Sequence, residues 1–129
     1  MLPDILNRDD IVTLVNTFYT EVRKDELLAP IFDERVKINW EKHLPVMYDF
    51  WENIVFYTGG YSGNPMQVHK QMHEKFSLST ADFARWIQLF TKTVDQLFEG
   101  EHAELAKQRA VSIATVMQLK ILHPSGLHV

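Results

Sequence analysis

The chain has 129 residues, of which 46% are hydrophobic and 12% aromatic, and this length predicts one domain spanning residues 1–129 with a single sizeable core. A formal net charge of −4 without a basic patch argues against nucleic acid as a partner, and the absence of cysteine excludes disulfides, thiolate zinc sites, iron–sulfur clusters and cysteine nucleophiles. The N-terminus does not read as a signal peptide and no apolar run is long enough to span a membrane, so we expect a cytoplasmic protein with no membrane partner.

The first predicted helix lies in "NRDDIVTLVNTFYTEVRKD", residues 7–25. Asn7 is the expected N-cap, and Asp9 and Asp10 suit the positive end of the helix dipole. Apolar residues at helical spacing form one stripe, which Tyr19 flanks: Ile11, Leu14, Val15, Phe18 and Val22. A short helix is expected over residues 29–35, in a loop region that also holds Phe32.

The second predicted helix lies in "NWEKHLPVMYDFWENIVFYT", residues 39–58. Pro45 is awkward in this segment, because proline lacks the N–H that a helix interior needs. Either the helix begins near Pro45 or it kinks there. The apolar face of the segment comprises Trp40, His43, Met47, Phe50, Trp51 and Ile54.

A glycine-containing loop separates this segment from "NPMQVHKQMHEKF", residues 64–76. This segment reads as an amphipathic helix, in which His69 and His73 lie on one face, one turn apart. Met66, Met72 and Phe76 share that face.

Two further helices are predicted before the chain ends. Ser79 and Asp82 resemble a capping box, and Gly100 suits the end of the helix that they begin. The stripe of this helix is Phe83, Trp86, Ile87, Phe90, Val94 and Leu97, and that of the next helix is Ala103, Ala106, Ala110, Ile113, Met117 and Ile121. Residues 123–129 are expected to form a flexible tail. The chain therefore reads as all-α.

The histidine pair His69 and His73 has three interpretations. It could be an ordinary surface pair. It could bind zinc, with a third ligand from His43, His102, His123 or His128, although Lys70 stands where the zinc protease motif needs glutamate. It could also supply one axial haem ligand, for which the Phe, Trp and Met stripes would provide apolar walls.

A second group of candidate residues consists of side chains that combine an aromatic ring with a polar group that can form hydrogen bonds. Tyr19, His43 and Trp86 lie on or beside the inward stripes of three different helices. Together they could offer hydrogen-bond donors to one small polar ligand, whereas each alone could bond backbone or water. Most of the acidic residues lie on the helix faces opposite the apolar stripes, as do Asp49, Glu52, Asp82 and Asp95. This position indicates a solvent-exposed surface rather than acid–base catalysts.

The chain resembles the third group of the truncated haemoglobins over nearly its whole length. The resemblance is carried by "VNTFYTEVRKDELLAPIF", "NWEKHLPVMYDFWENIVF", "YSGNPMQVH" and "DFARWIQLFTKTVDQLFEGEHAELAKQRAVSIA". Glycine pairs that shape loops in the other groups are largely absent here, apart from Gly59–Gly60. The resemblance implies a two-over-two globin fold with haem b between the helices.

The resemblance also assigns roles to individual positions. It places Tyr19 and Trp86 beside the ligand on the distal side of the haem, with His43 as the distal histidine and Phe32 packed on the haem. The iron-binding histidine falls on His69 when counted forward from His43 and on His73 when counted back from Trp86. We place the extra residues after the histidine, which favours His69, and His73 then lies near the haem edge.

Reversible binding of oxygen, or of another diatomic ligand, at a five-coordinate iron is the expected function. The alternative is a haem-dependent activity that destroys peroxide or nitric oxide with an external reductase, and a further one is a zinc-binding or cofactor-free helical module. The residues expected around the haem are Phe32, Met47, Phe50, Met72, His73, Phe76, Trp86 and Phe90.

Overall fold

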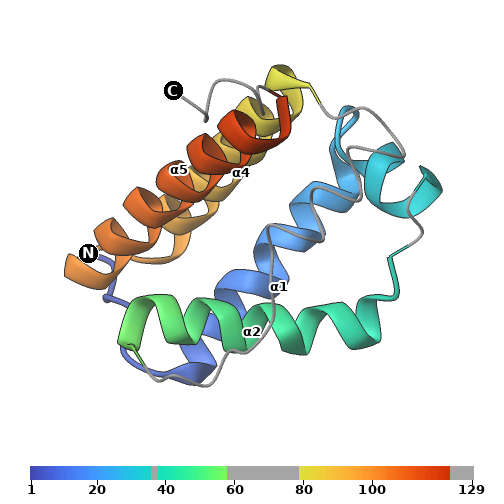
Figure 1. Ribbon diagram of the computed structural model, residues 1–129. Helices are drawn as coiled ribbons and strands as arrows, with labels where there is room; N and C mark the ends of the chain where they lie inside the picture. Colours follow the sequence, from blue (N-terminus) through green and yellow to red (C-terminus); the bar gives the residue numbers. More distant parts are fainter. Residues whose placement is uncertain (36–37, 58–78, 123–129) are drawn as a thin grey trace.

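The computed structural model describes residues 1–35, 38–57 and 79–122 of the chain, and all regular structure in them is helical (Figure 1). The elements are α1 (Arg8–Lys24), η1 (Pro30–Arg35), α2 (Trp40–Phe56), α4 (Thr80–Leu97) and α5 (Glu101–Leu122). The predicted helix over 64–76, with His69, Met72, His73 and Phe76, lies outside the described residues, as does the tail 123–129.

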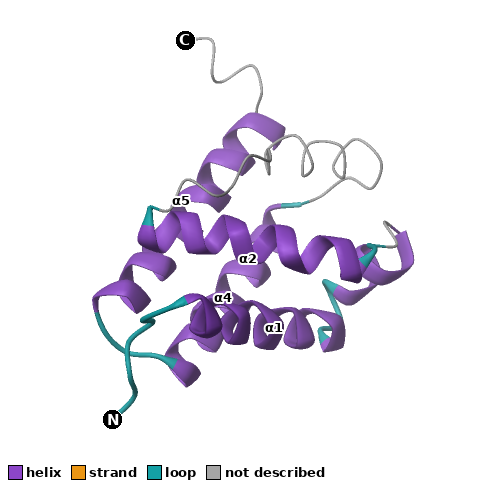
Figure 2. Cartoon of the chain, turned by 90° about the horizontal axis from the view of Figure 1, so that it is seen from below, coloured by secondary structure: helices purple, strands orange, loops and turns teal. Residues whose placement is uncertain are grey.

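The helices form two contacting pairs. α1 packs against α2, and α4 packs against α5, while α1 also contacts α4 and α2 also contacts α5 (Figure 1). Seen from below, the described part of the chain consists of helices joined by short loops (Figure 2). The predicted all-α, two-over-two arrangement is confirmed.

The first helix forms as its sequence predicts. The side chain of Asn7 accepts a hydrogen bond from the backbone N–H of Asp10 at 3.0 Å, and Asp9 and Asp10 occupy the first turn. Such a cap satisfies one of the N–H groups that a helix start leaves without a partner. The predicted stripe and the flanking Tyr19 are all buried.

Between α1 and α2 the chain makes the short helical element that the sequence predicts. It is a π-helix, Pro30–Arg35, and it places Phe32 in the core with only 7% of its surface exposed. Asp25 prepares this turn, because one oxygen of its carboxylate accepts the backbone N–H groups of Leu27 and Leu28 at 3.1 and 3.0 Å.

Helix α2 begins at Trp40, so Pro45 lies inside it and the alternative in which the helix begins near Pro45 is wrong. Proline cannot donate to the carbonyl of Glu41 one turn earlier, and the N-cap residue Asn39 makes no side-chain hydrogen bond to the helix. Packing outweighs these losses, because Met47, Phe50, Trp51 and Val55 are buried along the helix.

The predicted capping box is present at the start of α4. The Ser79 hydroxyl accepts the backbone N–H of Asp82, and the Asp82 carboxylate accepts that of Ser79 at 2.8 Å. The helix ends at Leu97, and Gly100 follows in the turn to α5 with φ of 145°, a conformation that favours glycine.

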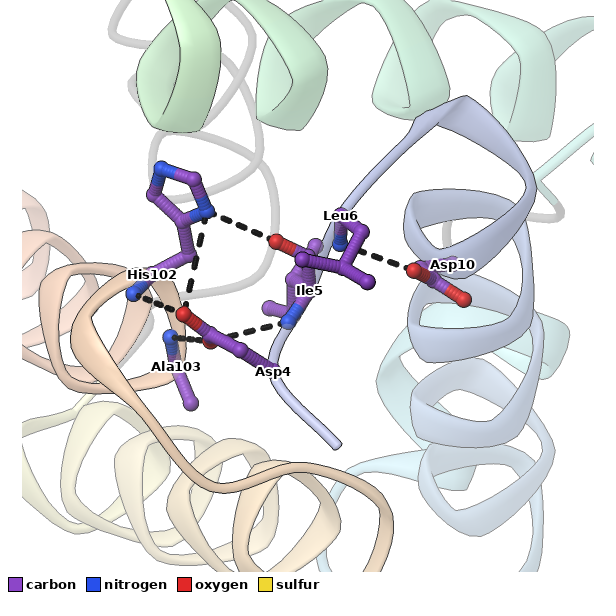
Figure 3. A network of polar contacts seen from close by, with 6 residues as sticks. All are labelled: Asp4, Ile5, Leu6, Asp10, His102 and Ala103. Carbon is purple, nitrogen blue, oxygen red and sulfur yellow. Dashed lines mark hydrogen bonds and ion pairs between the residues drawn. The ribbon is translucent and has the colours of Figure 1, made fainter. Parts of the chain in front are cut away.

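The N-terminal segment supplies the cap of α5. The Asp4 carboxylate accepts the backbone N–H groups of His102 and Ala103, both at 2.9 Å (Figure 3). His102 lies with its Nδ1 2.7 Å from the carbonyl oxygen of Ile5. The predicted alanine face of α5 is buried, so α4 can approach closely along it: Ala103, Ala106 and Ala110, joined by Ala114.

Candidate functional site

A cavity lies between the two helix pairs. Its lining is mostly apolar and includes residues of α1, η1, α2, α4 and α5: Tyr19, Leu28, Ile31, Phe32, Met47, Phe50, Trp51, Asp82, Phe83, Trp86, Ile113, Ala114 and Met117. Four of the residues predicted to surround a cofactor are therefore together in one place, namely Phe32, Met47, Phe50 and Trp86.

Phe90 lies behind this lining. Its ring is fully buried and stacks on Trp51, with ring centroids 4.6 Å apart, and on Trp86, at 5.8 Å. Phe18 meets both Phe90 and Trp86 edge-on. The stack holds Trp51 and Trp86 in place, so Phe90 supports two residues of the cavity wall.

Tyr19 brings a hydroxyl to this apolar cavity. Burial raises the pKa of the Tyr19 phenol above its usual value, and the phenol is protonated at neutral pH, as any tyrosine is. Its oxygen lies 3.4 Å from Nε2 of His43, and the tautomer of His43 decides which of the two atoms donates. His43 therefore touches the hydroxyl of Tyr19, while Tyr19 and Trp86 line the cavity from opposite helix pairs.

A cluster of aromatic and charged groups surrounds the Tyr19–His43 contact. The ring of Trp40 packs against those of Tyr19 and His43, and its indole Nε1 donates to the carboxylate of Asp33 at 2.9 Å. The sequence placed Trp40 on the inward face of its helix but gave Asp33 no role. Only the π-helix brings Asp33 within reach, and no local pattern marks that contact.

An ion pair joins a buried carboxylate at the end of α1 to a partly exposed arginine of α4. The Asp25 carboxylate, whose side chain is 5% exposed, pairs with Arg85 at 2.6 Å. Burial by itself would raise the pKa of Asp25, but hydrogen bonds from Arg85 and from the backbone of Leu28 and Leu27 outweigh it, and the pKa lies below its usual value. Sequence analysis missed this pair, which joins the end of α1 to the helix that carries Trp86.

The histidines in the described part of the chain do not meet. His43 is near the start of α2, whereas the ring of His102 packs on Phe56, the last residue of that helix. Thirteen residues of helix separate these positions by about 20 Å. Within residues 1–35, 38–57 and 79–122, no group of three histidine or acidic side chains is placed to hold a metal ion.

Residues 5–121 match the family described as bacterial-like globin. The chain belongs to this family. It is 28% identical over 128 residues to the group 3 truncated hemoglobin ctb of Campylobacter jejuni, covering 97% of this chain and 98% of that protein. The crystal structure of group III truncated hemoglobin from Campylobacter jejuni superposes with a TM-score of 0.81 at 27% identity, covering 94% of this chain and 95% of that one. The expected membership of the third group of truncated haemoglobins is confirmed.

Membership of the globin family implies haem as the cofactor and a diatomic gas as its ligand. The cavity of this globin fits such a group, because its walls are mostly apolar and aromatic and Tyr19, which carries a hydroxyl, is one of the lining residues. The predicted iron ligand, His69 or His73, lies outside the described residues. No helix in the described ranges is long and apolar enough to cross a membrane.

Proposed function

We propose that this globin binds oxygen reversibly at the iron of haem b. The observation that carries the proposal is Tyr19, a buried residue with a hydroxyl donor in the wall of a mostly apolar cavity. Haem, when bound, would supply an iron that takes up a diatomic gas and leaves partial negative charge on it. A neutral donor that stays protonated suits a ligand with partial negative charge, since charge-assisted hydrogen bonds are stronger than neutral ones.

Two donors and one histidine would form the distal side of the site. Tyr19 would donate from its hydroxyl, and Trp86, stacked on Phe90, would donate from its indole on the opposite helix pair. His43 touches the Tyr19 hydroxyl, and so we assign it either to gating ligand access or to adding a further donor.

The cofactor would be held by apolar contact and one axial bond. Phe32, Met47, Phe50 and Trp86 line the cavity and would pack on the porphyrin. His69 is our candidate for the axial ligand and His73 the alternative; the roles of Met72, Phe76 and Phe90 as haem contacts likewise stay predictions.

Reconstitution with haemin followed by absorption spectra tests the proposal. Ferric, ferrous, ferrous–CO and ferrous–O2 spectra are recorded on one preparation. We expect a Soret band in all four states and an oxygen complex that returns to the ferrous form when oxygen is removed. Oxidation to the ferric form on each exposure to oxygen would count against reversible oxygen binding, and the absence of a Soret band would remove haem binding as well.

A further inference from the structure

Trp40 packs against the aromatic rings around the Tyr19–His43 contact. Its ring centroid is 5.2 Å from that of Tyr19, 5.7 Å from that of His43 and 6.2 Å from that of Phe32. Trp40 is one helical turn before His43 on α2, so the two side chains share a face of the helix. The indole therefore limits the space in which the imidazole of His43 can turn.

Trp40 is itself held from the outside by two charged groups. Its Nε1 donates to one oxygen of Asp33 at 2.9 Å, and the other oxygen of Asp33 accepts Nε of Arg23 at 3.3 Å. The guanidinium of Arg23 also lies over the indole, 5.0 Å from the ring centroid, where a cation is attracted to the ring face. We name Arg23, Asp33 and Trp40 the indole clamp; it joins α1, η1 and α2.

The first turn of α2 needs such an external support. Asn39 makes no side-chain cap, and Pro45 leaves the carbonyl of Glu41 without its usual helical donor. The carbonyl of Asn39 accepts the backbone N–H groups of Lys42 and His43 at 3.1 and 2.9 Å, but without a side-chain cap this start, which carries both Trp40 and His43, frays more easily.

We propose that Trp40, fixed by Asp33 and Arg23, is a positioning residue that keeps His43 against the hydroxyl of Tyr19 and thereby sets how fast a gas ligand enters and leaves the cavity. This rests on the proposed function. The clamp acts on the barrier that a gas ligand crosses when it enters or leaves the cavity. A change in the clamp therefore changes the association and dissociation rate constants by the same factor, and the affinity for a weakly hydrogen-bonded ligand stays nearly unchanged.

Carbon monoxide binding to the reduced holoprotein tests the clamp. The variants are Trp40→Phe, which keeps a ring but loses the indole N–H, Asp33→Ala, and the two combined. Asp95→Ala is the matched control, because Asp95 forms a comparable surface pair with Lys107 between α4 and α5, elements that do not carry the clamp. Association is measured by flash photolysis, dissociation by replacement with nitric oxide, and the CO stretching band by infrared spectroscopy.

Losing one hydrogen bond of the clamp should raise both CO rate constants by about two- to tenfold. We expect the double variant to be no faster than the faster single variant, because both changes break the same contact. The CO band should broaden in these variants as His43 samples more positions, and Asp95→Ala should match the wild type. A purely structural role would lower the melting temperature and leave the rates and the band unchanged, which would overturn the proposal.

Failure of the proposed function can be told apart from failure of the clamp. A wild-type chain that takes up no haem refutes the function before any variant is compared. The clamp is then tested in the haem-free chain by the NMR signals of the His43 ring protons. Movement of these signals in Asp33→Ala, but not in Asp95→Ala, supports the clamp, and unchanged signals in both variants contradict it.

Discussion

Tyr19 is a buried tyrosine in the wall of the cavity. Its hydroxyl lies 3.4 Å from Nε2 of His43, and burial raises its pKa above the usual value. A polar tip in such surroundings costs stability unless a partner meets it. A ligand with partial negative charge would be a partner that the apolar wall does not supply.

Replacing Tyr19 by phenylalanine should therefore speed oxygen dissociation and leave the haem content unchanged. One hydrogen bond to a partly charged ligand contributes about 1.5–3 kcal/mol, which is roughly ten- to a hundredfold in affinity. Stopped-flow displacement of oxygen by CO measures the rate. Tyr48→Phe is the control, because Tyr48 donates to the exposed Asn16 instead. An unchanged rate in Tyr19→Phe together with a rise in Trp86→Phe would reverse the donor roles.

The two histidines of the segment 64–76 should respond differently to alanine. With His69 as the axial ligand, His69→Ala removes the one protein bond to iron, so haem should be lost quickly and added imidazole should restore the ferrous–CO spectrum. His73→Ala should keep a normal spectrum and lose little haem. Transfer of haem to excess apomyoglobin measures both variants side by side. Fast loss from His73→Ala with slow loss from His69→Ala would move the axial role to His73.

Asp25 should make stability depend on pH through its pair with Arg85. The pKa of Asp25 is lowered in the folded state, so its stabilising contribution is complete above its unfolded pKa and is lost as pH falls through the folded pKa. Arg85→Gln should lower the free energy of unfolding by about 1–1.5 kcal/mol at pH 7, less than for a fully buried pair, because the Arg85 side chain is 40% exposed and solvent screens the pair. The difference from the wild type should shrink below about pH 4, where the carboxyl of the unfolded chain begins to take up a proton before that of the folded protein does.

Urea unfolding at pH 7 and pH 3 measures this difference. The exposed acid Asp95 provides the comparison, because its pair with Lys107 is largely solvated and Asp95→Asn should cost under about 1 kcal/mol. An Arg85→Gln effect of equal size at both pH values would mean that packing of the arginine stem, and not the ion pair, provides the stability.

The turn between α4 and α5 depends on an element from the other end of the chain. Asp4 accepts two N–H groups of the first turn of α5 (Figure 3). The carbonyl of Pro3 accepts the backbone N–H of Glu99. At Gly100 a Cβ atom would lie 2.5 Å from Cγ of Asp4, and φ is 145°. The N-terminal segment and this turn therefore form one interlocked unit.

Gly100→Ala should destabilise the protein by roughly 1–3 kcal/mol, because strain of the backbone adds to the clash with Asp4. Asp4→Ala should cost about 0.5–2 kcal/mol through the lost helix cap. In the double variant the contacts of the new Cβ with Cγ and Oδ2 of Asp4 are removed, while the contact with Cβ of residue 4, at 2.7 Å, remains, so the cost of Gly100→Ala should fall only in part. Urea denaturation of the four proteins measures the cycle. Additive costs would show that the contacts with Cγ and Oδ2 contribute nothing to the cost of Gly100→Ala.

The elements around the site show how packing overrides local preference. Pro45 would be expected at a helix start, yet α2 extends to Trp40, where the ring of Trp40 contacts Tyr19 and Phe32. The gain from these ring contacts exceeds the loss of one helical hydrogen bond. The π-helix places Phe32 in the core and brings the carboxylate of the next residue, Asp33, to the indole N–H of Trp40. Two adjacent residues therefore contact different parts of the structure around the site.

On the scale of the whole molecule, the cavity draws residues from all five described helical elements. A cofactor seated there would contact both helix pairs at once, and the unfolded chain has no such site. Binding should therefore stabilise the entire fold by mass action.

Haem should raise the midpoint of thermal unfolding as its concentration rises. At about one hundred times the dissociation constant the gain is about 2.7 kcal/mol. Differential scanning calorimetry across a haemin titration measures it. A midpoint that stays constant across the titration would show that haem does not bind preferentially to the folded state.

Much of the architecture was predictable because helix signals are local. Stripes such as Leu14, Phe18 and Val22 repeat at the spacing of one helix, and a cap such as Asn7 acts on its own first turn. The same stripes placed Tyr19, Met47, Phe50 and Trp86 on inward faces, and the family resemblance added Phe32. The structure brings all five to one cavity. Their roles toward haem stay predictions.

The sequence by itself determined the helices, their buried faces and the family, since each depends on neighbours within a turn or on motifs read along the chain. Only the tertiary structure decided the polar contacts between elements. Asp25 meets Arg85 across 60 positions, Asp4 caps His102 across 98, and Asp33 reaches Trp40 through a π-helix. These pairs depend on how helix faces cross. The local sequence around a charged residue does not show whether its side chain is solvated or paired with a residue far along the chain. Only the fold shows which of the two is the case.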